Sequence, residues 1–189
     1  MHKDLKQERQ AALLKFQTIK EELGLSTSRQ LPVVPVTHFV TAKVTGTTIE
    51  FVKSSINKDV GVQSFDGDKL DALKPFLICG IALRYAEAAK ADNKTVATAS
   101  YSESAPAQLE NGTITLNQVN RGSVIDMLIS DAINQNTTNN NLDREFQVAD
   151  MPLLRDKASF TLEGKTSGEL DAAKDHFVRI ELRGYSLKS

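Results

Sequence analysis

The chain has 189 residues, of which 40% are hydrophobic and 25% are charged, the composition of an ordinary globular protein with a buried core. Lysine and arginine number 23 against 24 aspartate and glutamate residues, and this balance argues against nucleic acid or an anionic membrane as the main partner. A single cysteine excludes an intramolecular disulfide framework, and three histidines leave little for a Cys/His metal site.

The sequence contains no apolar run close to the roughly 20 residues that a transmembrane helix needs. Its first residues, MHKDLKQERQ, are too polar for a secretory signal sequence. We therefore expect no signal peptide and no transmembrane segment.

Residues 3–23 are predicted to form a helix, because apolar residues recur at spacings of three, four and seven. Gly24 is placed to cap the helix in the left-handed conformation. The stripe fits either the chain's own body or a neighbouring subunit. We interpret residues 1–25 as an assembly arm, whose contact residues are Leu5, Ala12, Phe16, Ile19 and Leu23.

Residues 26–35 are predicted to be a connector between this arm and a main domain over residues 36–189. Pro32 and Pro35 push the residues that precede them toward extended conformations.

From residue 36 the apolar period changes from helical to alternating. Residues 36–44 and 48–53, joined through Gly46, predict a hairpin, and residues 60–65 predict another short strand. The most apolar segment, residues 76–85, suits a strand that is buried on both faces.

Residues 96–101 and 113–119 are further strand candidates, the second one starting after the turn-forming Asn111-Gly112. In residues 113–119, Ile114, Leu116 and Gln118 should share one side. Residues 123–133 have helical spacing, but strands flank them, so we predict a strand followed by a turn. The polar run at residues 134–141 predicts a loop.

The C-terminal part alternates clearly. Phe160 and Leu162 share one side, and a polar connection over residues 164–174 leads to the last strand. In that strand Val178, Ile180 and Leu182 should face inward. Eight or nine strands with irregular connections predict a mainly β fold, an antiparallel β-sandwich, and we favour the jelly roll within that class.

The three histidines give no site. His2, His38 and His176 lie far apart in the sequence. His176 follows Asp175, but neighbours on a strand point to opposite faces, so they make a poor acid–base pair. We expect His176 to be a half-exposed residue at the start of the last strand.

The other chemically active residues also have simpler interpretations. Cys79 lies in the most apolar segment, where thiols are usually inert. Asp66, Asp68 and Asp71 lack the remaining ligands of a calcium loop, since Leu77 stands at its twelfth position, so we expect a solvated acidic turn. We predict no catalytic residue, no cofactor and no metal, and therefore a protein that is not an enzyme.

Residues 109–184 resemble small jelly-roll structural proteins of bacteriophages, mainly their C-terminal half. The similar segments are LENG at 109–112, FQV at 146–148, MPLL at 151–154, FTL at 160–162 and DHFVRIELRG at 175–184. The resemblance implies a virion protein, a capsid or capsid-associated subunit that binds itself and other virion structural proteins and is assembled in the host cytoplasm. It carries over no binding residue.

Two other classes use a similar sandwich. A carbohydrate- or receptor-binding module usually presents exposed aromatic residues, and with no tryptophan in the chain Tyr101 and Tyr185 are its candidates here. An enzyme of the cupin type needs clustered histidine and carboxylate ligands, and the scattered histidines argue against it.

Overall fold

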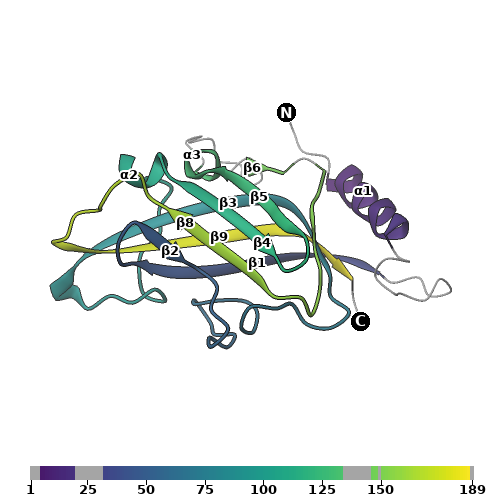
Figure 1. The fold of residues 1–189 in the computed structure, drawn as a ribbon, viewed down its shortest axis with the longest axis horizontal. Coiled ribbons are helices and arrows are strands. Elements are labelled where there is room, and N and C mark those ends of the chain that lie inside the picture. Colours follow the sequence, from purple (N-terminus) through teal and green to yellow (C-terminus); the bar gives the residue numbers. More distant parts are fainter. Residues whose placement is uncertain (1–4, 20–31, 134–145, 149, 188–189) are drawn as a thin grey trace.

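The computed structural model describes residues 5–19, 32–133, 146–148 and 150–187, and the ribbon in Figure 1 shows their arrangement. The first helix and the strands before the short 3-10 turn are α1 (Leu5–Thr18), β1 (Val33–Val44), β2 (Thr48–Glu50) and β3 (Phe76–Ala89). They are followed by η1 (Lys90–Asp92), α2 (Ala107–Glu110), β4 (Thr113–Gln118), β5 (Gly122–Leu128) and α3 (Ile129–Ala132). The last elements are β6 (Phe146–Gln147), β7 (Leu153–Leu154), β8 (Phe160–Lys165) and β9 (Lys174–Leu187).

The strands form two antiparallel sheets. The five-stranded sheet has the order β1-β9-β3-β6, with β7 also pairing with β3, and the four-stranded sheet has the order β2-β8-β4-β5. Figure 1 shows the strands of the four-stranded sheet crossing those of the five-stranded sheet. The predicted mainly β fold with antiparallel sheets and an N-terminal helix is therefore confirmed.

The interior core lies between the sheets, because alternate residues of both face inward. Each predicted inward set is buried in the structure. The set consists of Ile114, Leu116 and Gln118 in β4, Phe160 and Leu162 in β8, and Val178, Ile180 and Leu182 in β9.

Strand β3 is buried on both faces, as predicted. Ile78, Ile81 and Leu83 belong to the interior core, whereas Leu77 and Cys79 belong to a second hydrophobic cluster on the outer face. The strand continues to Ala89, past the expected end at Tyr85. The expectation of a strand followed by a turn at residues 123–133 is also confirmed, by β5 and the short helix α3.

The predicted hairpin is wrong. Strand β1 pairs with β9 and β2 pairs with β8, so the chain passes from one sheet to the other at Gly46. Gly46 has a φ of +139°, a conformation that favours glycine. The alternating pattern shows which residues face inward but not which strand they pair with, and a short glycine connection suits both arrangements.

Three other predicted segments need correction: the connector ends earlier than expected, and the strands predicted at residues 60–65 and 96–101 do not form. Strand β1 begins at Val33, so residues 33–35 of the expected connector are strand, and residues 26–31 lie outside the described part of the chain. Residues 60–65 make only isolated bridges, such as that between Val40 and Gln63. Residues 96–101 contain a turn, and Tyr85 makes a bridge with Ser102 immediately after it. The predicted loop at 134–141 also lies outside the described residues.

Pro35 is tolerated inside β1 because β1 is an edge strand. The amides of Phe39 and Thr41 donate to Ser64 and Val62, away from β9. Residues of the same parity therefore direct their amide groups to the outer edge, and the missing N–H of Pro35 removes no bond to β9.

Candidate functional site

The second hydrophobic cluster lies where α1 packs on the outer face of the five-stranded sheet, and we call this cluster the α1 seat. Ala12 and Phe16 are the buried residues of the helix. The sheet side of the seat consists of Val33, Leu77, Cys79, Leu153, Tyr185 and Leu187, with Ile19 and Met151 packed at its margin. The same strands also supply Phe76, Ile78 and Leu154 to the interior core, so the sheet is apolar on both faces at this end.

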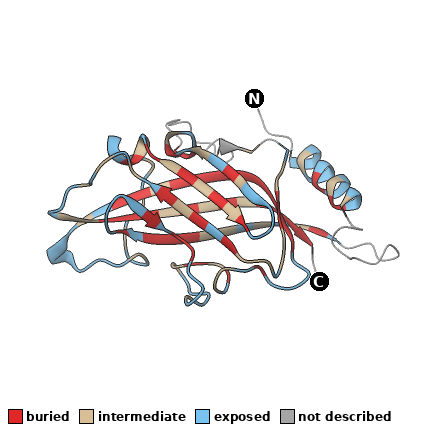
Figure 2. Cartoon of the chain, in the orientation of Figure 1, coloured by how far each residue is buried: buried red, intermediate tan, exposed pale blue. Residues whose placement is uncertain are grey.

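The structure brings together only part of the predicted contact stripe. Ala12 and Phe16 are buried and Ile19 is half-buried, but Leu5 is 44% exposed. Leu23 lies outside the described residues. The described helix ends at Thr18, and residues 20–23 of the predicted helix lie outside the described part of the chain. Figure 2 shows most of α1 as exposed, with its buried positions on one side.

A partly buried ion pair ties the helix to the sheet. Two nitrogens of Arg183 donate to the two carboxylate oxygens of Glu8 at 2.7 and 2.9 Å, the bidentate geometry that gives strong charge-assisted bonds. The Glu8 side chain is only 9% exposed. Burial, and after it the carboxylate of Glu8, raises the pKa of Tyr185 to about 12, so its hydroxyl keeps its proton and donates to Glu8.

Two further bonds fix both sides of α1. Arg9 donates to the carbonyl of Val33 at 3.3 Å, and Lys15 donates to the carbonyl of Asp150. Sequence reasoning missed this polar part of the seat, because Glu8 and Arg183 are 175 residues apart and neither follows the apolar period. A groove of about 450 Å³ runs beside the helix, lined by Leu5, Lys6, Arg9, Pro35, Val36, Thr37, Arg183 and Tyr185.

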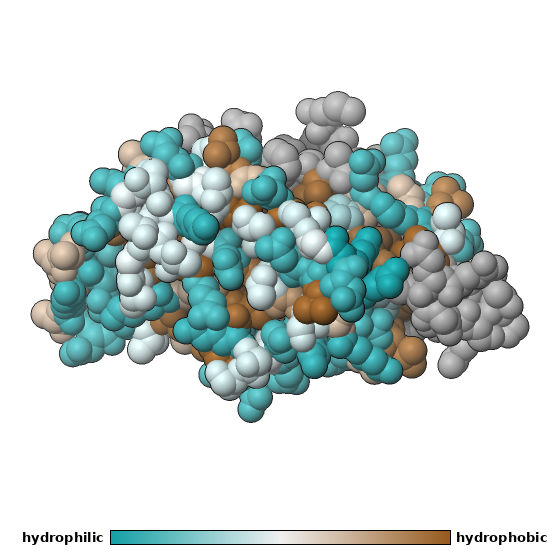
Figure 3. Space-filling model, viewed as in Figure 1, coloured by the Kyte–Doolittle hydropathy of each residue, from teal (hydrophilic) through white to brown (hydrophobic). Residues whose placement is uncertain are grey.

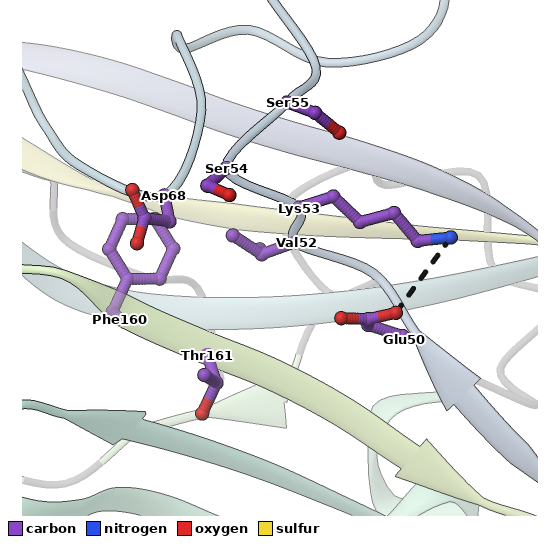
Figure 4. A pocket seen from close by; sticks show the side chains of 8 residues that line it. All are labelled: Glu50, Val52, Lys53, Ser54, Ser55, Asp68, Phe160 and Thr161. Atoms are coloured by element: carbon purple, nitrogen blue, oxygen red, sulfur yellow. Dashed lines mark ion pairs between the residues drawn. The ribbon is translucent and has the colours of Figure 1, made fainter.

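A second, polar hollow of about 350 Å³ lies beside β2 and β8. It is lined by Glu50, Val52, Lys53, Ser54, Ser55, Asp68, Phe160 and Thr161. Figure 4 shows the side chains that line the hollow, with Lys53 paired with Glu50. The nitrogen–oxygen distance of this pair is 3.8 Å. Two carboxylates, three hydroxyls and one ammonium group can exchange hydrogen bonds with a polyhydroxylated ligand. The surrounding surface is largely hydrophilic in the view of Figure 3.

The histidines behave differently from one another. His38 packs edge-on against Phe65 and Phe76, and burial lowers its pKa to about 4, so it is neutral at physiological pH. His176 is 5% exposed, so the expectation of a half-exposed residue is wrong. The separation of His176 from Asp175 is confirmed, because the Asp175 carboxylate pairs with Lys43 at 2.9 Å.

Two of the three aspartates in the 66–71 segment have separate partners. Asp66 accepts a bond from the amide of Lys58, and Asp71 pairs with Lys74, whose hydrogen bond lowers the pKa of the Asp71 carboxyl. Among the described residues, no group of three His, Cys, Asp or Glu side chains is close enough to hold a metal ion. Cys79 is buried in the α1 seat.

The two tyrosines that a carbohydrate-binding module would present are not exposed on the surface. Tyr185 is buried under α1, and the hydroxyl of the half-buried Tyr101 donates to the carbonyl of Val96.

Comparisons with known proteins give no match: no family model matches the chain, and neither a curated protein nor a solved structure matches it significantly. Within the described part of the chain, no helix has the length and apolar character needed to cross a membrane.

Proposed function

We propose that this chain is a structural subunit of a virus particle, a non-enzymatic protein that assembles through a jelly-roll sandwich with α1 as its assembly arm. The observation that carries the proposal is the strand pairing. Jelly rolls are one of the common architectures of capsid proteins, although they also occur in lectins and cupins. A jelly roll alone therefore does not indicate a function, and the proposal also rests on the arm.

The pairing can be compared with that of a long hairpin of eight strands that rolls up into two sheets. In the open hairpin, strand 1 pairs with 8, 2 with 7, 3 with 6 and 4 with 5, and rolling adds the pairs 3·8 and 4·7. If β6 and β7 count as one interrupted strand, the six pairings of this chain follow the same scheme. They are β1·β9, β2·β8, β3·β6/β7, β4·β5, β3·β9 and β4·β8, all antiparallel.

The α1 seat supports the second half of the proposal. The helix is a separate cover on the sheet and contributes nothing to the interior core. Residues 19–32 join it to β1, and a chain of that length spans roughly 45 Å when fully extended. The helix of one copy can therefore occupy the seat of a second copy with the contacts it makes on its own sheet, which is the usual basis of arm exchange.

Removing the arm tests the proposal. We expect the full chain to form oligomers visible by light scattering and negative-stain microscopy, and deletion of residues 1–30 to leave a smaller species whose sandwich still unfolds cooperatively. A full chain that stays monomeric at high concentration contradicts self-assembly. A deletion variant that keeps the full oligomer size contradicts the role of the arm.

A carbohydrate- or receptor-binding function is the second candidate, and the polar hollow beside β2 favours it. Saturation-transfer NMR with a panel of mono- and oligosaccharides tests it. Binding should be lost in Asp68→Ala and kept in Asp66→Ala, a matched control whose carboxylate bonds the amide of Lys58 and does not line the hollow. No binding by the unmodified chain, or equal binding by both variants, rejects this function for the hollow.

A further inference from the structure

The connection between β8 and β9 lies at the end of the sandwich opposite α1 (Figure 1). A chain of short polar contacts surrounds His176, near the start of β9. The Nδ1 atom of His176 lies 2.6 Å from the hydroxyl of Tyr85, and its Nε2 atom lies 2.8 Å from the carbonyl of Asp171. The Tyr85 hydroxyl lies 3.1 Å from a carboxylate oxygen of Glu87, and Lys174 pairs with the other oxygen at 2.5 Å. His176 and Tyr85 are both buried.

The protons of this chain of contacts can be counted. A carbonyl only accepts, so the contact between Nε2 and Asp171 needs a proton on Nε2. A neutral imidazole then has no proton on Nδ1, and the single proton of the Tyr85 hydroxyl can serve either Nδ1 or the ionised Glu87 but not both. One of these two contacts is left without a proton. In the imidazolium, Nδ1 donates to Tyr85, Tyr85 donates to Glu87, and each of the three contacts has one proton.

The residues that face His176 come from each neighbouring segment. Strand β3 supplies Tyr85 and Glu87, β9 supplies Lys174, and the connection before β9 supplies Asp171, whose carboxylate accepts a bond from the amide of Ala173. Strand β1 places the neutral Val44 opposite His176. Lys174 is already paired with Glu87, and the Asp175–Lys43 pair points to the other face.

We infer that Tyr85, His176 and Glu87 form a proton-operated latch that holds the β8–β9 connection against the end of the sandwich. When His176 takes up a proton, both contacts of the Tyr85 hydroxyl are hydrogen-bonded at once, and the bond to Asp171 becomes charge-assisted and stronger. When the proton leaves, one of the two Tyr85 bonds is lost and the bond to Asp171 weakens. The latch therefore tightens when His176 is protonated by a fall in pH and loosens when the proton is lost. The inference does not depend on the proposed assembly.

Tyr85→Phe tests the latch, because it removes only the hydroxyl that relays the proton. The melting temperature of the full chain is measured from pH 8 to pH 5 for the unmodified protein and for the variant. We expect the difference between the two to grow by about 3 °C toward pH 5. Repeating the comparison in a His38→Gln background removes the titration of His38, which is half-buried in the sandwich. A difference that is independent of pH overturns the inference.

A second measurement does not depend on how stable any variant is. The imidazole ¹⁵N signals of His176 in the unmodified chain should be those of a doubly protonated ring at pH 5. The amide of Lys174 donates to the carbonyl of Asp171, and its hydrogen exchange should be slower at pH 5 than the intrinsic effect of pH on exchange explains. A ring that remains neutral at pH 5 overturns the inference. So does a Lys174 protection factor that does not change with pH.

Discussion

The interior core and the α1 seat are both clusters of buried hydrophobic residues, but they differ in what closes them. The interior core is enclosed by two sheets, and the chain crosses from one sheet to the other six times. The core therefore cannot open unless the whole sandwich unfolds. The α1 seat is closed by one helix of 14 residues on a single connection. An isolated helix of that length is marginal in water. The same sheet therefore has one face covered by a second sheet and one face covered at its end by a single helix.

The largest expected effect is in the interior core. Leu116→Ala removes a fully buried side chain between the sheets and should lower the free energy of unfolding by about 2–5 kcal/mol. Urea denaturation measures this loss. Leu14→Ala is the control, because Leu14 is 56% exposed on α1 and its truncation should change stability by less than about 0.5 kcal/mol. Equal losses for the two variants contradict the position of the core.

Phe16→Ala should act on the α1 seat instead. We expect a loss of about 2–3 kcal/mol, at the low end for a buried phenylalanine, because the helix can detach while the sandwich stays folded. Cys79 is the chain's single cysteine and lies in the seat, so the rate at which a thiol reagent labels it reports opening of the seat. Labelling should become faster in Phe16→Ala in the absence of urea. An unchanged rate means that α1 does not cover Cys79.

Acid should weaken the interior core through His38. Its pKa of about 4 in the folded state lies below its ordinary value of 6.5, so the folded chain takes up its proton later than the unfolded chain. The stability contributed by neutral His38 is complete above about pH 6.5 and is lost as the pH falls toward 4, with about 2 kcal/mol lost at pH 5. Urea titrations at several pH values measure it. His38→Gln should remove this acid loss, and an identical pH profile in the variant rejects the assignment.

The smallest expected effect concerns the ion pair of the seat. Glu8→Gln leaves the helix in place but removes the charge that Arg183 and Tyr185 bind, and we expect a loss of about 1 kcal/mol. The pKa of Tyr185 should fall from about 12 part of the way toward 10, since burial is the larger cause and remains. Absorbance of the tyrosinate during an alkaline titration measures the change. A pKa of Tyr185 that does not move would show that Glu8 does not interact with it.

Much of the fold could be predicted because one residue in two faces the core. This period located β4, β8 and β9 and the inward residues of each, and the unbroken apolar run located β3. The same reasoning could not predict which strands pair, because the period of a strand does not identify its neighbour in the sheet. The hairpin at Gly46 failed for that reason.

The candidate site shows the same limit. The stripe identified Ala12 and Phe16 correctly, but the residues that hold α1 down are Glu8 and Arg183, which meet only in the folded chain. His176 was misjudged because its partner Tyr85 lies 91 residues away.

The claim that α1 is an exchangeable assembly arm can be tested directly with one engineered thiol. Ala12 and Cys79 belong to the same buried cluster, so in Ala12→Cys a disulfide to Cys79 records which sheet the helix occupies. Heavy- and light-isotope copies of the variant are unfolded, mixed, refolded to the assembled state and oxidised, and the linked peptides are identified by mass spectrometry. The account predicts links between heavy and light copies at close to the statistical proportion. Links found only within single copies, in a preparation that is fully assembled, would contradict it.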